Sequence, residues 1–240
     1  MIIEFFQALF SDAPKWAKQQ DLVKESVAIG ARYQRQKKFW ASHLENCQAE
    51  IRNFQKAYAQ AKKIAVLGSG HLLDFPQELL ERPDLEFFLF DAVHPREIRK
   101  RSFRAKCHFI SRDLNLKPSE LRDDILNQCD IFISTNLLSQ LALSGSQHLK
   151  SEQRETFAKS LVENHMQLLK SLPGPTLLLS DFEKRFISSK DEEIVTETTL
   201  WGYRMPSPRR TWWWSLAPKG EISNDFRLEL QVGVWQISMN

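Results

Sequence analysis

The stretch "KIAVLGSGHLLDFP", from Lys63 to Pro76, joins a short apolar run to two glycines that lie one residue apart. An apolar run ending in glycine is typical of a buried strand whose C-terminal turn approaches a ligand, because glycine leaves space and accepts a positive φ. Two leucines, Leu72 and Leu73, follow where nucleotide-binding loops often have a third glycine. The class of ligand therefore depends on what this turn can accommodate.

Downstream, short runs of branched and aromatic residues alternate with polar, helix-like segments. The runs are KIAVLG, LEFFLFD, CHFISRD, CDIFISTN and TLLLSD. Runs that are apolar on both faces fit strands buried from both sides, and crossover helices between them require a parallel sheet. Two further runs, TWWWSLAP and FRLELQVGVWQI, have only a turn-like segment between them. The pattern predicts an α/β fold: a doubly wound, mostly parallel seven-stranded sheet closed by an antiparallel C-terminal hairpin.

The first 62 residues are helical in pattern. Apolar residues recur at steps of three and four from Tyr33 to Tyr58, apart from one gap of seven, as one buried stripe of a long helix requires. A shorter helix is expected to begin after Asp12, with Gly30 as a break between the two. We therefore expect an N-terminal helical extension over residues 1–62 and a Rossmann-like domain over residues 63–240.

Composition is ordinary for a globular protein of 240 residues, with 42% hydrophobic and 26% charged residues. The three cysteines are far apart and lack CxxC or histidine-rich neighbours, so no disulfide framework and no metal site is predicted. The apolar N-terminus is short and carries Glu4, which argues against a signal peptide or a membrane partner and predicts a cytoplasmic location. A net charge of +3 permits a nucleic-acid partner without favouring one, and the oligomeric state is left open.

Two acidic residues follow the next two strands. Asp91 ends the second strand, 21 residues after Gly70, where a carboxylate can accept hydrogen bonds from both hydroxyls of an adenosine ribose. Asp113 follows the third strand and is a candidate for the adenine edge. Helix capping is the plain alternative for each.

The loop after the glycines discriminates between two ligand classes. A dinucleotide needs helix N–H groups close to the glycines, facing its pyrophosphate. Here Asp74 and Gln77 resemble a capping box with Pro76 in the first turn, so the helix is expected to start late. That favours an adenosine-containing ligand without phosphate, such as S-adenosylmethionine.

From Lys63 onward the chain resembles the class I S-adenosylmethionine-dependent methyltransferases. Their first motif is matched by Gly68 and Gly70, their second by Asp91 in "LFDAVHP", and their third by Asp113 in "ISRD"; "CDIFISTNLLSQL" matches their fourth loosely. The resemblance implies S-adenosylmethionine as cofactor, held by Gly68, Ser69, Gly70, Asp91, Asp113 and Ser134.

The chain departs from the family pattern at two positions. Leu72 replaces the third glycine of the first motif, and Val66 stands where many members have an acidic residue two positions before the first glycine. In the family, both positions lie near the methionine end of the cofactor.

Catalytic candidates are few. Asn136 ends the fourth strand and could orient an acceptor, with helix capping as the equal alternative; His71 in the glycine loop could touch the cofactor or act as a base, although an exposed loop histidine is the commoner case. The basic cluster Arg32, Arg35, Lys37 and Lys38 could bind phosphates but fits a solvated helix face better.

The predicted function is methyl transfer from S-adenosylmethionine to an unidentified acceptor, a small molecule or RNA. Two alternatives stay open: an NAD(P)-dependent oxidoreductase, which would share both glycines and Asp91, and a non-catalytic binding module on the same fold.

Overall fold

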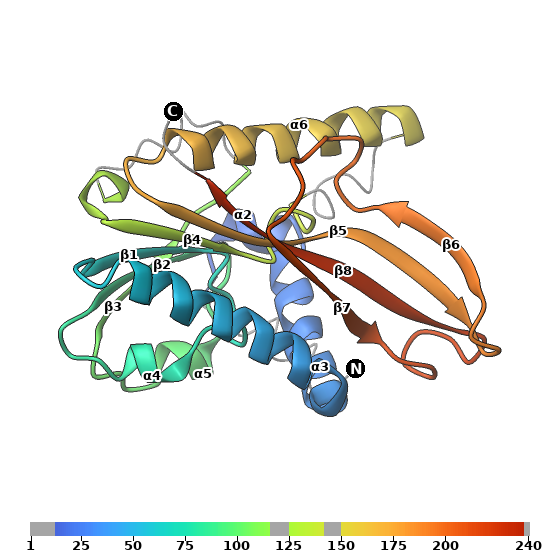
Figure 1. The fold of residues 1–240 in the computed structure, drawn as a ribbon, viewed down its shortest axis with the longest axis horizontal. Coiled ribbons are helices and arrows are strands. Elements are labelled where there is room, and N and C mark those ends of the chain that lie inside the picture. Colours follow the sequence, from blue (N-terminus) through green and yellow to red (C-terminus); the bar gives the residue numbers. More distant parts are fainter. Residues whose placement is uncertain (1–12, 116–124, 142–149, 238–240) are drawn as a thin grey trace.

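A computed structural model describes residues 13–115, 125–141 and 150–237 of the chain. Its centre is an eight-stranded sheet with the order β3-β2-β1-β4-β5-β8-β7, and β6 pairs with β5 beside this path (Figure 1). The strands are β1 (Lys63–Leu67), β2 (Glu86–Asp91), β3 (Lys106–Ser111), β4 (Ile131–Thr135), β5 (Thr176–Ser188), β6 (Glu193–Thr198), β7 (Arg210–Ala217) and β8 (Phe226–Ile237).

The direction of the strands confirms the predicted fold class. β1 to β5 pair in parallel, whereas β8 runs antiparallel to both β5 and β7. The number of strands was wrong by one, because β6 adds to the seven expected. β5 continues to Ser188, well past the predicted TLLLSD run, and its second half pairs with β6 on one side and β8 on the other.

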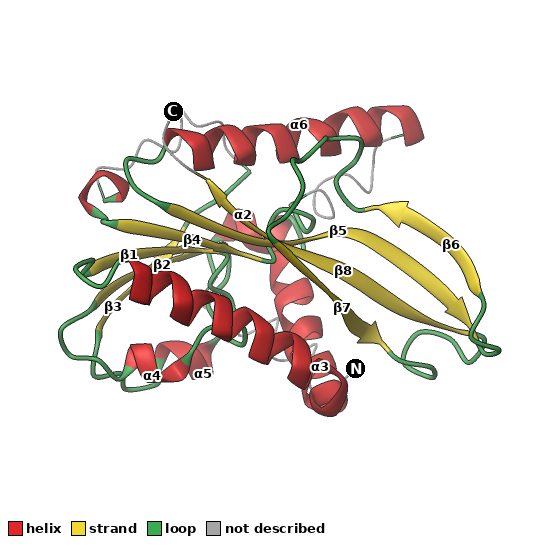
Figure 2. Cartoon of the chain, viewed as in Figure 1, coloured by secondary structure: helices red, strands yellow, loops and turns green. Residues whose placement is uncertain are grey.

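Helices lie on both sides of the sheet, as a doubly wound fold requires. They are α2 (Lys15–Gln19), α3 (Leu22–Ala57), α4 (Gln77–Leu80), α5 (Arg96–Arg99), the 3-10 helix η1 (Leu126–Gln128) and α6 (Ser151–Ser171). α6 covers one face, and α3, α4 and α5 lie on the other (Figures 1 and 2). One of the polar, helix-like segments between the predicted strands, PSELRDDILNQ, falls largely on residues 116–124, outside the described part of the chain.

Alternate residues of the central strands enter two different cores. Ala65 and Leu67 of β1 pack into the cluster that α6 covers, whereas Ile64 and Val66 pack into the cluster that contains α3 and α4 residues. Because successive side chains point to opposite faces, a strand buried on both sides must be apolar throughout. This is the physical reason why KIAVL predicts a central strand.

The long helix differs from the prediction at Gly30. α3 runs through Gly30, and its non-helical residue is Gln36. A Cβ on Gly30 would lie 2.7 Å from the His71 ring, so glycine serves here as a site of close approach and not as a helix break. The expected break was therefore wrong, because the glycine is required by a tertiary contact that the local sequence does not reveal.

Tryptophan side chains join α3 to the C-terminal strands. Trp40 meets Trp214 edge-on, with ring centroids 4.9 Å apart, and its Nε1 donates to the Leu216 carbonyl at 3.0 Å. Trp213 points to the other face of the sheet, where the Arg185 guanidinium lies 3.7 Å from its ring. The three consecutive tryptophans thus serve mainly as hairpin core, in line with the alternation of a strand.

Candidate functional site

The turn after β1 requires glycine for two physical reasons. Gly68 has a φ of +81°, and a Cβ there would lie 2.9 Å from both Leu137 Cβ and the Thr135 carbonyl. Gly70 has a φ of +38°, and a Cβ there would meet only Asp91 Oδ2, at 3.6 Å. Gly68 therefore lets β1 and the end of β4 approach each other, whereas Gly70 leaves open space above the turn.

The missing third glycine has a structural explanation. Leu72 adopts a φ of +53°, in the left-handed region that glycine enters without strain. Its side chain is buried and packs with Val66 and Phe75 in the core under the loop. The loop thus keeps a glycine-like backbone at this position, while the burial of a leucine side chain offsets the strain.

Asp91 is held in the turn by backbone donors. Its Oδ2 accepts from Gly70 N at 2.8 Å and its Oδ1 from Val93 N at 3.1 Å. Burial raises the pKa of this carboxyl, and these backbone hydrogen bonds partly offset that effect. Each carboxylate oxygen can accept a second hydrogen bond, so Asp91 can still receive two hydroxyl groups.

A cavity lies over this turn and collects most of the predicted site residues. Gly68, Ser69, Gly70, His71, Asp91, Asp113 and Asn136 all line it. Ser134 does not: its buried hydroxyl lies 3.0 Å from His165 Nε2, on the α6 side of the sheet. Asp113 Oδ1 accepts from Asn115 N at 2.9 Å, and the next residue, Leu114, also lines the cavity.

The first turns of α3 form one wall of this cavity. Ser26 and Ile29 line it, and His71 Nε2 donates to the Ser26 carbonyl at 2.8 Å. His71 therefore fastens the glycine loop to α3. A glycine inside a strongly helical pattern, Gly30, was the available signal for this close approach.

The predicted capping box does not form. α4 begins at Gln77, and no side chain caps it; Gln77 Nε2 instead donates to the Leu72 and Phe75 carbonyls. The late helix start is confirmed, seven residues beyond Gly70. Asp74 is thereby free of the helix and turns toward Asn136.

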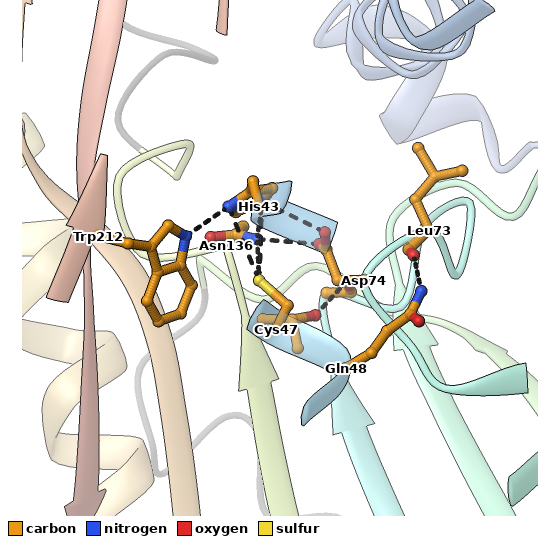
Figure 3. Close-up of polar contacts among 9 residues, drawn as sticks. His43, Cys47, Gln48, Leu73, Asp74, Asn136 and Trp212 are labelled. Carbon is orange, nitrogen blue, oxygen red and sulfur yellow. Dashed lines mark hydrogen bonds and ion pairs between the residues drawn. The ribbon is translucent and has the colours of Figure 1, made fainter. Parts of the chain in front are cut away.

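A polar cluster missed by sequence analysis surrounds Asp74 (Figure 3). Asn136 Nδ2 donates to Asp74 Oδ2 at 2.9 Å, and His43 Nε2 lies 3.5 Å from Asp74 Oδ1. Trp212 Nε1 donates to His43 Nδ1 at 3.1 Å, and the His43 ring stacks on Trp214 with centroids 3.9 Å apart. Four distant segments of the chain meet here, so no local spacing could have predicted it.

Cys47 completes this cluster one helical turn after His43. His43, Cys47 and Asp74 present ligand atoms within 4.8 Å of one another, although no metal site was expected. Burial, followed by the nearby Asp74 charge, raises the pKa of the Cys47 thiol well above its usual value. Cys47 is therefore protonated at neutral pH.

Buried histidines make stability depend on pH. Burial lowers the pKa of His94, beside Ser69, and of His165, beside Ser134, to about 4 each. The unfolded chain then binds more protons than the folded one between about pH 4 and pH 6.5. Stability from these groups is complete above that window and is lost as pH falls through it.

We expect the free energy of unfolding to fall by about 2 kcal/mol per histidine between pH 7 and pH 5. Urea titrations at the two pH values measure this. Burial raises the pKa of Asp91 and of Asp181, so these two carboxyl groups make the fold more stable as the pH falls and oppose the histidines. The wild type is therefore compared with His165→Gln, whose side chain cannot titrate. In the variant, the part of the change in the free energy of unfolding that comes from the two histidines should be roughly halved. An unchanged pH dependence would contradict the lowered pKa of His165.

No family model and no curated protein matches the sequence. Among solved structures, the N-terminal domain of EvdMO1 with SAH bound matches with 11% identity and a TM-score of 0.35, over 78% of this chain and 80% of that one. An O-methyltransferase family protein from Burkholderia thailandensis matches with 12% identity and a TM-score of 0.43, over 100% and 68%. The methyltransferase domain of bacterial CtHen1-CN matches with 12% identity and a TM-score of 0.33, over 79% and 99%.

The strand order decides the fold independently of these likenesses. Five parallel strands closed by an antiparallel hairpin are what the resemblance to the class I methyltransferases implies, and in the structure β8 lies between β5 and β7. The fold is a Rossmann-like α/β sheet. Within residues 13–115, 125–141 and 150–237, no helix combines the length and apolar character needed to cross a bilayer.

Proposed function

We propose that the chain binds S-adenosylmethionine in the cavity over the glycine turn and transfers its methyl group to an acceptor. The charge of the cavity carries this proposal. Four carboxylates line it, those of Glu25, Asp74, Asp91 and Asp113, and no lysine or arginine is among the described lining residues. S-adenosylmethionine has a sulfonium, an ammonium and one carboxylate, so its net charge of about +1 suits an acidic cavity.

Asp91 is the proposed ribose ligand. Backbone N–H groups hold both of its oxygens in the turn, which fixes the carboxylate before the ligand arrives. Two ribose hydroxyls would donate to the remaining lone pairs, each charge-assisted bond contributing about 1.5–3 kcal/mol. Gly70, whose missing side chain leaves space beside Asp91, would allow the ribose to approach.

The adenine ring is assigned to the far side of Asp91. Val93, Leu114 and Ile29 line the cavity with apolar side chains, and Asp113 and Asn115 line it with polar ones. Apolar walls with a few polar groups at the edge suit a flat heteroaromatic ring. We therefore keep Asp113 as the candidate for the adenine edge, and leave Ser134 aside because it packs against α6.

The transfer itself needs little from the protein beyond alignment. Bound S-adenosylmethionine would supply an activated methyl group, whose bond to sulfur breaks as an acceptor N, O or S atom forms its own bond to carbon. Orientation of two reactants can lower a barrier by roughly 7–11 kcal/mol. Asn136 is the candidate for orienting the acceptor, whether this is a small molecule or RNA. It directly follows β4 with a φ of +44°, and its backbone N–H donates to the Leu179 carbonyl.

His71 is the second catalytic candidate, but its ring already joins the glycine loop to α3. Its Nε2 proton is committed to the Ser26 carbonyl, and Nδ1 lies 3.8 Å from Glu97. We therefore assign it the positioning of α3 over the glycine loop ahead of proton transfer.

The two alternatives fit this cavity less well. A nicotinamide dinucleotide needs donors for its pyrophosphate, whereas α4 begins seven residues beyond Gly70 and the described lining carries four carboxylates. A non-catalytic binding module would use the same cavity, and only turnover with an acceptor distinguishes it from an enzyme.

Thermal melts with S-adenosylhomocysteine and with NAD test this proposal. S-adenosylhomocysteine at 100 times its dissociation constant should stabilise the fold by about 2.7 kcal/mol, which raises the Tm by roughly 5–10 °C for a chain of this size. NAD should give no shift. A shift with NAD alone would overturn the proposal.

A further inference from the structure

Asp74 carries a negative charge that its neighbours do not neutralise. The contacts of its carboxylate are the Asn136 amide at 2.9 Å and the His43 ring at 3.5 Å, and no lysine or arginine among the described residues lies within ion-pair distance. Its side chain is 23% exposed and lines the cavity. A charged group in this position can receive a cation from the cavity.

The geometry around His43 argues against a metal ion as that cation. A metal-bound imidazole donates its second N–H to an acceptor such as a carboxylate or carbonyl. The second nitrogen of His43 instead accepts, because the Trp212 indole N–H points at Nδ1 from 3.1 Å. The proton of His43 therefore sits on Nε2, the atom that a metal shared with Asp74 would need.

The same hydrogen bond limits what the His43 ring can offer Asp74. A doubly protonated ring would turn its own Nδ1–H against the Trp212 N–H, and the parallel stack on Trp214 leaves the ring little freedom to rotate. A singly protonated His43 offers Asp74 one N–H and no charge. The remaining lone pairs of Asp74 are available to a ligand.

Asn136 provides an independent sign of an absent partner. Asn136 is 6% exposed and lines the cavity, and its Oδ1 is buried without a hydrogen-bond partner among the described residues. Since Asp74 only accepts, the Asn136 amide must present Nδ2 to it, which leaves Oδ1 as an unused acceptor. The Asp74 carboxylate and the Asn136 Oδ1 atom can therefore both accept a hydrogen bond from an N–H donor.

The position of Asp74 points to one source for this donor. Asp74 lies on the glycine loop, on the Asn136 side of the turn, whereas Asp91 lies on the β2 side. The position two residues before Gly68, acidic in many class I methyltransferases, is Val66 here and is buried in the core. An acidic group for the amino-acid end of the ligand must then come from elsewhere.

We infer that Asp74, held by Asn136 and His43, forms a subsite for the α-ammonium group of the cofactor's methionine moiety. This inference rests on the proposed function. Asp74 would then bind the group for which the family pattern has an acidic residue at the position of Val66, eight positions earlier. The inference also explains why His43 and Trp212 support a carboxylate in the wall of the cavity.

Calorimetric titrations with two ligands test the subsite. S-adenosylhomocysteine carries the α-ammonium, whereas 5′-methylthioadenosine shares the adenosyl group and lacks it. Asp74→Asn, which keeps the shape of the side chain, should weaken binding of S-adenosylhomocysteine by about 10- to 100-fold and leave that of 5′-methylthioadenosine within about twofold. Asp84→Asn removes the same charge from an exposed site outside the cavity and should change neither affinity.

Each other outcome has a distinct meaning. If Asp74→Asn leaves the ratio of the two affinities unchanged while the wild type binds both ligands, the subsite is overturned and the proposed function stands. If the wild type binds neither ligand, both are overturned. Stoichiometric zinc in the purified protein that is lost in Cys47→Ser would also overturn the subsite, in favour of a metal centre.

Discussion

Replacing Asp91 with alanine is expected to weaken S-adenosylhomocysteine binding by at least about 100-fold. Two ribose hydroxyls would each lose a charge-assisted hydrogen bond, and each such bond contributes about 1.5–3 kcal/mol. The turn itself would also loosen, because Gly70 N and Val93 N both donate to this carboxylate. Calorimetry gives the affinity, and a melt without ligand shows how far the fold is affected.

Asp91→Asn separates the two effects. The amide keeps one acceptor oxygen and nearly the same shape, so one of the two backbone donors, Gly70 N or Val93 N, keeps its partner. This variant should therefore loosen the turn less than alanine does and lose about 10-fold in affinity. An affinity of Asp91→Ala within twofold of the wild type would mean that the ribose lies elsewhere, and the proposed cofactor site would then be wrong.

Trp40→Ala should have the largest effect on stability. The side chain is 3% exposed, packs edge-on against Trp214, and belongs to the apolar cluster that joins α3 to the β7–β8 hairpin. Truncation of a buried tryptophan costs about 3–5 kcal/mol, which lowers the Tm by about 10 °C in a chain of this size. Urea titration and a thermal melt measure the two quantities.

Two neighbouring variants serve as controls for Trp40. Trp40→Phe keeps a ring and loses the hydrogen bond to the Leu216 carbonyl, at a cost of roughly 0.5–1.5 kcal/mol plus the lost packing. Phe39→Ala, at a half-exposed position on the adjacent residue, should change stability by less than about 0.5 kcal/mol. Equal effects of Trp40→Ala and Phe39→Ala would contradict the docking of α3 described above.

The central strands could be predicted because their signal is local and repeated. In β1 and β2 every residue after the first faces a core, apart from Asp91 at the end, so the strand reads as an uninterrupted apolar run. β6 gives no such signal, because all six of its residues, Glu193 to Thr198, are exposed. It is a strand only because the extended end of β5 offers an edge to pair with, and a sequence pattern does not record that edge.

The glycine-turn side of the cavity was accessible to sequence reasoning for a related reason. Gly68, Gly70 and Asp91 lie at the ends of adjacent parallel strands, β1 and β2, so their separation along the chain fixes their separation in space. His43, Asp74 and Trp212 lie on a helix, a loop and a distant strand. Their meeting depends on how α3 crosses the sheet.

The sequence by itself determined the parallel sheet, the glycine turn and the acid at the end of β2, because each follows from periodicity or from spacing within one strand–helix–strand unit. Only the tertiary structure decided that Gly30 admits His71, that Ser134 faces α6, and that Asp74 joins Asn136 instead of capping a helix. The physical reason is the same in each case: these contacts arise between segments whose relative position is set by packing across the whole domain, and local preference is overruled there.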